Sequence, residues 1–380
     1  MNTAKAPQLT LISARDRLRG RVLTIINWET AEGMATHLDV DYEGLVITGA
    51  RRHQTMRKLS RMFPGLLLMA EPDAHDDHEA TAESFWHIPG AEKEGLFAAP
   101  SVEDTLADQR QSGASVVLLP AGYVGVGDVE SLRNMVFAAN EIMGDDIALP
   151  LYLASGWLKP AYREFLLAVL SESRHPVLLA FGSTTNPLNT ARKLELYIDI
   201  AAQAEVFCWR TDLAGLAALA HGALGAAIGT APGLRRCTAP KDKGKARRPG
   251  DPTPYVLVPR HMHWIKTGAL RDEVYVGSPA PTCTCRECGG QRIDRFTKDQ
   301  AAAAARHSHA ILDEYAQTLL RAAEDERALL WREMAQDALV AHEATGAVIG
   351  RTWPAPLDVA TFAEPTYEPE SSDSTRRVNA

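Results

Sequence analysis

The sequence is poor in cysteine and has no long apolar run, and both absences exclude classes of protein. Five cysteines in 380 residues are too few for a disulfide framework. The longest apolar stretches fall far short of a membrane span, and the first twenty residues lack the apolar core of a signal peptide. We therefore expect a soluble, cytoplasmic protein that does not bind membranes.

Several nucleotide-binding and hydrolase signatures are also missing. The chain contains no Walker loop, no Rossmann glycine fingerprint and no nucleophile-elbow motif. Its formal charge, 40 − 48 = −8, argues against a general nucleic-acid coat protein. An apolar content of 46% is enough to bury one large core or two ordinary ones.

Positive charge is nevertheless concentrated in one segment. Its basic side chains, opposed only by Asp242, are Arg235, Arg236, Lys241, Lys243, Lys245, Arg247 and Arg248. Residues 238–254 are rich in Pro, Gly and charge, which is typical of a long loop. Two interpretations stay open at this stage: a loop that contacts phosphates, and a solvated surface loop.

The first 236 residues repeat one theme, a short apolar run followed by a helix-like stretch. The apolar runs are residues 21–27, 44–48, 65–70, 114–119, 147–153, 176–181, 204–209 and 224–228. Most are continuous rather than alternating, as expected of strands buried on both faces. Helical patterns between them include residues 130–142, 161–172 and 191–202. Eight such units predict a (β/α)₈ barrel over residues 1–236, with a doubly wound open sheet as the alternative.

The remaining third of the chain has a different organisation. As a segment of the chain, the basic loop is taken to span residues 237–254. After it we predict a short strand at 255–258, a cysteine cluster and a long helical region from about Lys298 to His342. Together these form a zinc-binding subdomain with C-terminal helices over residues 255–363. The polar tail, 364–380, is predicted to be disordered.

The cysteine cluster predicts a metal site. Cys283, Cys285 and Cys288 lie within six residues, and thiolates hold Zn²⁺ tetrahedrally. A fourth ligand would come from the following helix, where His307 and His309 are the candidates. Residues i and i+2 point to different sides of a helix, so only one of the two can ligate, and periodicity does not say which. Four closed ligands leave no open position, which indicates a structural zinc.

This cluster, followed by a histidine at the start of a long helix, resembles that of the tRNA-guanine transglycosylase superfamily. The resemblance implies a (β/α)₈ barrel with an attached zinc subdomain. It also implies exchange of a guanine in tRNA or DNA for a 7-deazaguanine, so the expected partners are a nucleic acid and a 7-deazaguanine base. Some relatives occur in antiviral defence gene clusters. The oligomeric state is left open, with a homodimer as one alternative.

The sequence departs from that family in its catalytic motifs. The family's Asp-Ser-Gly-Gly-Phe motif is absent, and Ala226 or Ala227 stands where the late aspartate nucleophile would be. Two hypotheses follow: a divergent base-exchange enzyme, and an inactive barrel that binds a deazaguanine, a nucleic acid or a partner protein.

Reactive groups of such barrels lie just after each strand, at the carboxyl-terminal face. Glu71 and Asp73 are the best carboxylate pair there, because two neighbouring acids can divide the roles of nucleophile and general acid or base. We interpret Asp76 and Asp77 as part of a solvated acidic loop.

The same positions supply candidate substrate-binding residues. They are Trp28, Ser183, Arg210, Asp212, Arg235 and Arg236. Trp28, together with Trp157 and Trp209, offers a stacking wall for a base. Asp212 has a strong alternative role as the N-cap of the helix that follows it.

Overall fold

The computed structural model describes residues 12–89, 100–242 and 251–345. All eight predicted strands form in it. They are β1 (Arg21–Asn27), β2 (Glu43–Thr48), β3 (Leu67–Ala70), β4 (Val117–Leu118), β6 (Ile147–Ala154), β7 (Val177–Gly182), β8 (Phe207–Thr211) and β9 (Gly225–Gly229). A further short strand, β5 (Tyr123–Val124), pairs with β6 and was not predicted.

The strands form one parallel sheet in the order β3-β2-β1-β9-β8-β7-β6-β4. Its two ends approach each other, because the Ser115 amide donates to the Leu68 carbonyl at 2.8 Å and the Leu68 amide donates to Ser115 Oγ at 3.2 Å. The sheet is therefore nearly closed, and the prediction of a (β/α)₈ barrel rather than an open sheet is confirmed.

Burial explains why the strands read as continuous apolar runs. Every residue of β2, β6, β7, β8 and β9 is buried, because one face packs inside the barrel and the other under the helices. Polar residues are therefore rare within the strands, and the charged groups collect at the strand ends.

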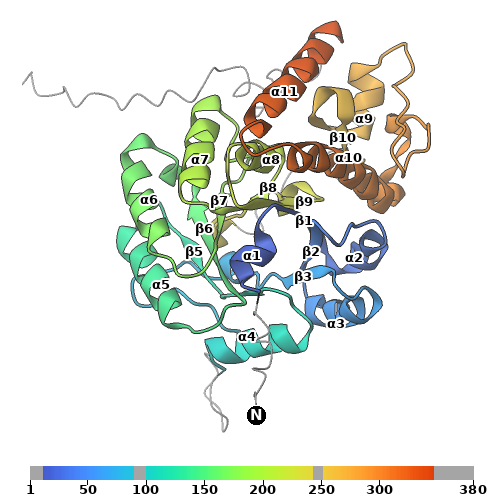
Figure 1. Cartoon of the computed structure of the whole chain (residues 1–380). Helices are drawn as coiled ribbons and strands as arrows, with labels where there is room; N and C mark the ends of the chain where they lie inside the picture. The colour runs from blue at the N-terminus through green and yellow to red at the C-terminus, as the bar shows by residue number, and fades with distance from the viewer. Residues whose placement is uncertain (1–11, 90–99, 243–250, 346–380) are drawn as a thin grey trace, which may run out of the picture.

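Helices alternate with the strands around the barrel (Figure 1). They are α2 (Trp28–Ala35), α3 (Arg52–Met62), α4 (Val102–Gln111), α5 (Val129–Glu141), α6 (Arg163–Ser171), α7 (Ala191–Gln203) and α8 (Leu213–Ala220), preceded by α1 (Ala14–Leu18) below β1. The three helices predicted at 130–142, 161–172 and 191–202 correspond to α5, α6 and α7.

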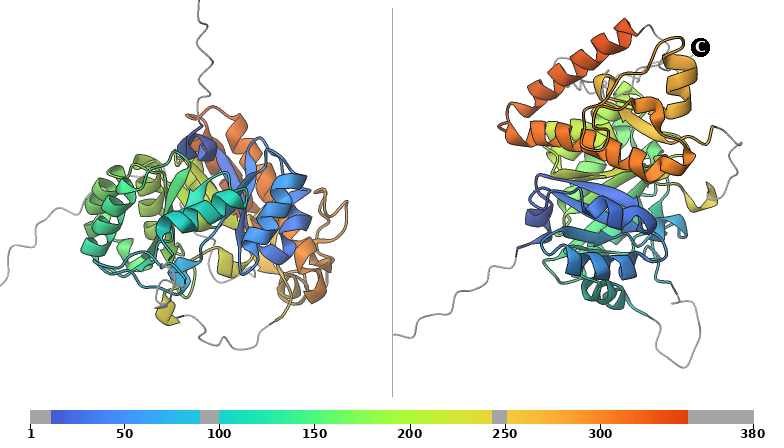
Figure 2. Two further views of the ribbon diagram at one scale, coloured as in Figure 1. Left: turned by 90° about the horizontal axis from the view of Figure 1, so that it is seen from below. Right: turned by 90° about the vertical axis from the view of Figure 1, so that its right-hand side faces the viewer.

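The outer helix that should follow β9 is supplied from far along the chain. After β9 the chain builds a hairpin of β10 (Tyr255–Val258) and β11 (His263–Lys266), then α9 (Thr267–Ala269) and the cysteine segment. It returns as α10 (Ala301–Arg321), which packs against β1, α2 and α8. One face of α10 thus covers the barrel and the other supports the subdomain (Figure 2).

The prediction of one long helical region is wrong in one respect. α10 ends at Arg321, and α11 (Arg327–Ala344) begins after a break. Ala322 has an extended backbone with ψ 152°, which ends the hydrogen-bond ladder just before an acidic stretch. α11 leaves at an angle and packs on the hairpin side of the molecule (Figure 2).

Among the residues that the structure describes, no helix combines the length and apolar character needed to cross a bilayer. The predicted disordered tail, 364–380, and most of the basic stretch, 243–250, lie outside the described residues.

Candidate active site and metal centre

A buried ion pair lies at the carboxyl-terminal end of the barrel strands. Glu71 directly follows β3 and is fully buried, and its Oε2 accepts from Arg210 Nη1 at 2.6 Å. Its Oε1 accepts from the Tyr152 hydroxyl at 3.0 Å and from Trp209 Nε1 at 3.1 Å. A buried carboxylate needs such compensation, because an unpaired one would cost several kcal/mol (roughly). Both oxygens of Glu71 are therefore engaged by protein groups.

Arg210 joins three parts of the barrel mouth. Besides Glu71, its Nε donates to the Arg236 carbonyl at 2.9 Å and its Nη2 to the Gly233 carbonyl at 3.0 Å. Its backbone is left-handed, with φ 49°, at an irregularity in the pairing of β8 with β9. A left-handed arginine is strained, by about 1–3 kcal/mol, and such strain is typical of functional sites.

Asp73 is the carboxylate that faces open space. It lines a pocket of about 400 Å³ together with Thr48, Gly49, Arg52 and Arg210. Its side chain is 25% exposed, and its Oδ2 accepts from Arg52 Nη1 at 3.1 Å and from the Gly49 amide at 3.3 Å. The neighbouring acids Asp76 and Asp77 also line the pocket, at its rim.

The surroundings of Asp73 raise its pKa to about 6. Burial is the main cause, and the nearby negative charge of Glu71 adds to it. Arg52, Arg210 and the Gly49 amide oppose this effect on the pKa by stabilising the charged form. A carboxylate whose pKa lies near neutrality can act as a nucleophile, a base or an acid, and Asp73 is therefore the candidate reacting group of this pocket.

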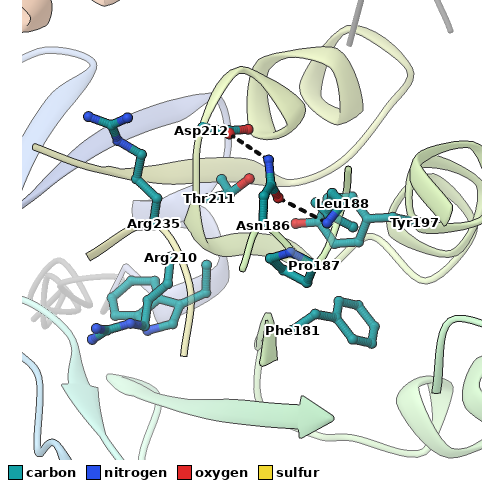
Figure 3. Close-up of a pocket in the computed structure, with 10 residues that line it drawn as sticks. Phe181, Asn186, Pro187, Leu188, Tyr197, Arg210, Thr211, Asp212 and Arg235 are labelled. Carbon is teal, nitrogen blue, oxygen red and sulfur yellow. Dashed lines mark hydrogen bonds between the residues drawn. The ribbon is translucent and has the colours of Figure 1, made fainter. Parts of the chain in front are cut away.

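Two predicted substrate-binding residues are engaged in local turns. Asp212 caps α8, because its Oδ1 accepts from the Ala214 amide at 3.0 Å, and its Oδ2 lies 3.4 Å from Asn186 Nδ2 (Figure 3). Ser183 Oγ accepts from the Thr185 amide at 3.3 Å. On one side Asp212 and Asn186 line a small pocket of about 10 Å³, room for one water molecule, and on the other they line a larger pocket of about 300 Å³. The structure thus shows the capping role of Asp212 and also places its side chain at the wall of the larger pocket.

The predicted tryptophan wall needs correction. Trp157 and Trp209 are both fully buried, and Trp157 Nε1 donates to the Gly125 carbonyl at 2.7 Å. Neither ring has a free face, because both pack within the core. Trp28 is partly exposed, and the Arg51 guanidinium lies over its ring at 5.0 Å. Of the three predicted rings, Trp28 is the one that keeps part of its surface exposed.

Arg235 and Arg236 line a second pocket, between the barrel and the hairpin, of about 300 Å³. The Arg235 guanidinium stacks on Trp264 of β11 at 3.3 Å and donates from Nε to the Gly229 carbonyl at 2.9 Å. Burial lowers the pKa of Arg235 to about 9. Of the basic loop that follows, Lys241 is paired with Glu79 at 3.5 Å.

The predicted metal ligands converge. Cys283, Cys285, Cys288 and His307 place one ligand atom each within 4.8 Å of all the others, and the cluster can hold a metal ion. His307 Nδ1 lies 3.7, 3.4 and 3.2 Å from the three sulfurs in that order. Bonds of about 2.3 Å to sulfur and 2.0 Å to nitrogen separate such atoms by roughly 3.5 Å in a tetrahedron, which fits these distances.

The surrounding groups orient this cluster. His307 Nε2 donates to the Leu257 carbonyl at 2.9 Å, which leaves Nδ1 unprotonated towards the sulfurs. Gly289 and Gly290 have positive φ values of 55° and 89°, so the chain can turn back after the third cysteine. The Arg295 guanidinium donates to Cys288 Sγ at 3.0 Å and offsets thiolate charge.

His309 is placed elsewhere. Its Nε2 lies 3.1 Å from Glu43 Oε1 and its Nδ1 lies 3.1 Å from Thr24 Oγ1. It fastens α10 to β1 and β2, while His307, two residues earlier, faces the sulfurs. Both histidines are buried, but on opposite sides of the helix.

Some residues of the site were not predicted from the sequence. Tyr152 lies inside an apolar run, and nothing in the run shows that its hydroxyl reaches Glu71. The buried His75 stacks on Tyr152 with ring centroids 3.8 Å apart. Trp264 and Arg52 were also not singled out as binding residues. The position of Arg52 after the end of β2, between Arg51 and His53, could have indicated a binding role, because the reactive groups of such barrels follow the strands.

Comparisons with known proteins do not identify a family for this chain. No family model matches the sequence, and no curated protein is similar to it. Among solved structures, the chain is similar to a mutant α-subunit of tryptophan synthase from the hyperthermophile Pyrococcus furiosus. The identity is 11% and the TM-score 0.28, over 56% of this chain and 87% of that one.

Proposed function

We propose that this chain is an enzyme that acts at the barrel mouth through Asp73, as a divergent base-exchange transglycosylase on tRNA or DNA. The observation that carries the proposal is Asp73 itself, a partly exposed carboxylate with a pKa of about 6 in a pocket of about 400 Å³. The reaction type rests on the resemblance of the cysteine segment to that superfamily.

In the proposed reaction an oxygen of ionised Asp73 bonds to C1′ of the nucleotide as the C1′–base bond breaks. The departing guanine takes up a proton from water in the open pocket, and the incoming base later gives one back to water. The incoming deazaguanine then attacks C1′ through its ring nitrogen, loses its proton and releases Asp73. Arg52 and the Gly49 amide hold the carboxylate in place. Glu71 is a positioning residue in this scheme, because Arg210, Tyr152 and Trp209 occupy both of its oxygens.

A labelled-base exchange assay tests this function. Purified protein would be incubated with tRNA or duplex DNA and radiolabelled guanine or 7-deazaguanine base. Asp73→Asn should lower the initial rate at least about 100-fold, because it removes the nucleophile. Asp337→Asn, at an exposed position on α11, is the matched control and should keep the wild-type rate. Wild-type protein that incorporates no base into any nucleic acid would contradict the proposal.

A second function is favoured by β9. Ala226 and Ala227 are fully buried and pair with neighbouring strands, so no side chain there can approach a sugar. A barrel of this kind could bind a 7-deazaguanine base without turning it over. Calorimetry with the free base distinguishes the two functions, because saturable binding without any exchange is the signature of the second.

We further propose that the metal held by the cysteine cluster is zinc and that it is structural. Three thiolates and one imidazole favour Zn²⁺ and fill a tetrahedral shell. When bound, the ion cross-links the cysteine segment to α10 and so to the barrel. Metal analysis of protein purified without added metal should give about one zinc per chain, and a different resident metal would overturn this assignment.

A further inference from the structure

A line of positive charge runs along the outer face of α3 and begins at the barrel mouth. We define this basic ridge as Arg51, Arg57, Lys58 and Arg61. All four side chains are exposed, and at about 100° per residue they fall within an arc of roughly 120° on the helix. The whole chain has a formal charge of −8, whereas α3 carries no acidic side chain.

The ridge has little internal compensation. Lys58 is paired with Glu32 of α2, at 2.6 Å. Arg57 and Arg61 form no ion pair with any residue in the described ranges, and Arg51 lies over the Trp28 ring. Three guanidinium groups therefore remain free to bind an anion.

From these contacts we infer that the basic ridge binds the phosphate backbone of a nucleic acid that enters the barrel mouth. From Arg51 to Arg61 the helix rises about 15 Å at 1.5 Å per residue, a length that spans several consecutive phosphates of one strand. The upper end of the ridge adjoins the candidate active site, because Arg52, the next residue after Arg51, is bound to Asp73.

The flanking helices define the shape of the partner. Besides Glu32, which is paired with Lys58, α2 carries Glu29, and α4 carries Glu103, Asp104 and Asp108. These acids repel a polyanion on either side, so the ridge fits a single line of phosphates rather than a broad charged surface. A membrane fits less well, because α3 buries Met56 and Leu59 against the barrel and exposes a single apolar side chain, Met62, at its far end.

This inference deepens the proposed function and rests on it for the identity of the polymer. Fluorescence anisotropy tests it with a labelled RNA stem-loop and a labelled DNA duplex, each titrated at several salt concentrations. The variant Arg51→Gln/Arg57→Gln/Arg61→Gln should bind the preferred probe at least about tenfold more weakly at low salt. Its slope of log affinity against log salt should fall by about 2–3, since three phosphate contacts are removed.

The matched control removes the same charge elsewhere. Arg174→Gln/Lys298→Gln/Arg332→Gln should bind within about twofold of wild type, and circular dichroism would establish that both triple variants are folded. Equal losses in the two variants, or no loss in either, would overturn the inference. So would a ridge variant that loses binding only to phosphatidylserine vesicles.

The outcome is separable from that of the proposed function. Asp337→Asn, at an exposed position on α11, should bind the probe with wild-type affinity, since it lies outside both the ridge and the pocket of Asp73. Loss of binding in the ridge variant without any base exchange by wild type would leave the ridge standing and remove the enzyme. If the ridge variant exchanged bases at the wild-type rate and bound the probe with wild-type affinity, the ridge inference would be overturned and the enzyme proposal would stand.

Discussion

The cysteine cluster and the barrel mouth both hold charge away from water, but they are assembled differently. Three of the four candidate metal ligands come from six consecutive residues, and local hydrogen bonds between backbone amides and carbonyls shape their turn. At the barrel mouth, Glu71 and Arg210 are 139 positions apart, Trp209 precedes Arg210 on β8, and Tyr152 comes from a further strand, β6. The first site can hold a metal ion between its four side chains, whereas the buried charges of the second are paired with each other. The two regions should therefore fail in different ways.

Removal of the metal should have the largest effect. Cys288→Ser breaks a closed shell whose binding free energy is on the order of 10 kcal/mol in small zinc domains, so the cysteine segment should detach from α10. The expected result is loss of bound metal and a fall of several kcal/mol in the free energy of unfolding.

Metal analysis and thermal unfolding would check this outcome. Cys237→Ser, at a buried cysteine outside the cluster, is the control and should keep its metal. Full metal content in Cys288→Ser would contradict the ligand assignment.

Breaking the self-compensated site should come next. Glu71→Ala leaves the Arg210 guanidinium buried without its partner, which typically costs about 3–5 kcal/mol. Urea unfolding measures the change, and metal content should not alter. Glu32→Ala removes one partner of the exposed pair with Lys58 and should cost less than about 1 kcal/mol. A similar small cost for Glu71→Ala would show that the buried pair is dispensable.

Mild acid should affect the hairpin beside the cysteine cluster and the barrel mouth in opposite directions. Burial lowers the pKa of His261 and of His263, both near the hairpin, to about 4. These rings are neutral in the folded protein, so their stabilising contribution is complete above pH 6.5 and is lost as the pH falls towards 4, by up to about 3 kcal/mol each.

Asp73 behaves conversely, because its folded pKa of about 6 lies above the unfolded value. Its contribution to stability grows as the pH falls from about 6, by less than about 3 kcal/mol given its partial exposure. The free energy of unfolding would be measured at pH 7.5, 6 and 5. It should fall less steeply with falling pH in His263→Gln than in the wild type, and more steeply in Asp73→Asn. Identical pH dependence in both variants would contradict these pKa directions.

The smallest effect concerns coupling within the barrel mouth. Glu71→Gln removes a negative charge beside Asp73 and frees the Arg210 charge, and both changes lower the pKa of Asp73. The acid limb of the exchange rate should therefore move below pH 6 by about one unit, equivalent to roughly 1.4 kcal/mol. An unshifted limb would show that Glu71 does not influence the reacting group.

Local patterns in the sequence predicted the strands, the cysteine cluster and the pair of carboxylates. Each apolar run became a strand, because a strand buried on both faces must be apolar along its whole length. The three cysteines indicated a metal site, because their spacing acts through a few bonds of chain. Glu71 and Asp73 were singled out from their position after β3.

Interactions between distant segments decided the rest. Periodicity could not choose between His307 and His309, because both sides of α10 are buried, one against the hairpin and one against the barrel. The division of roles between Glu71 and Asp73 depended on which carboxylate met Arg210. Sequence alone thus determined the strands and the thiol ligands through short-range chain geometry. Only the closed barrel determined which charges are paired and which carboxylate faces the pocket, because those partners meet only when the barrel closes.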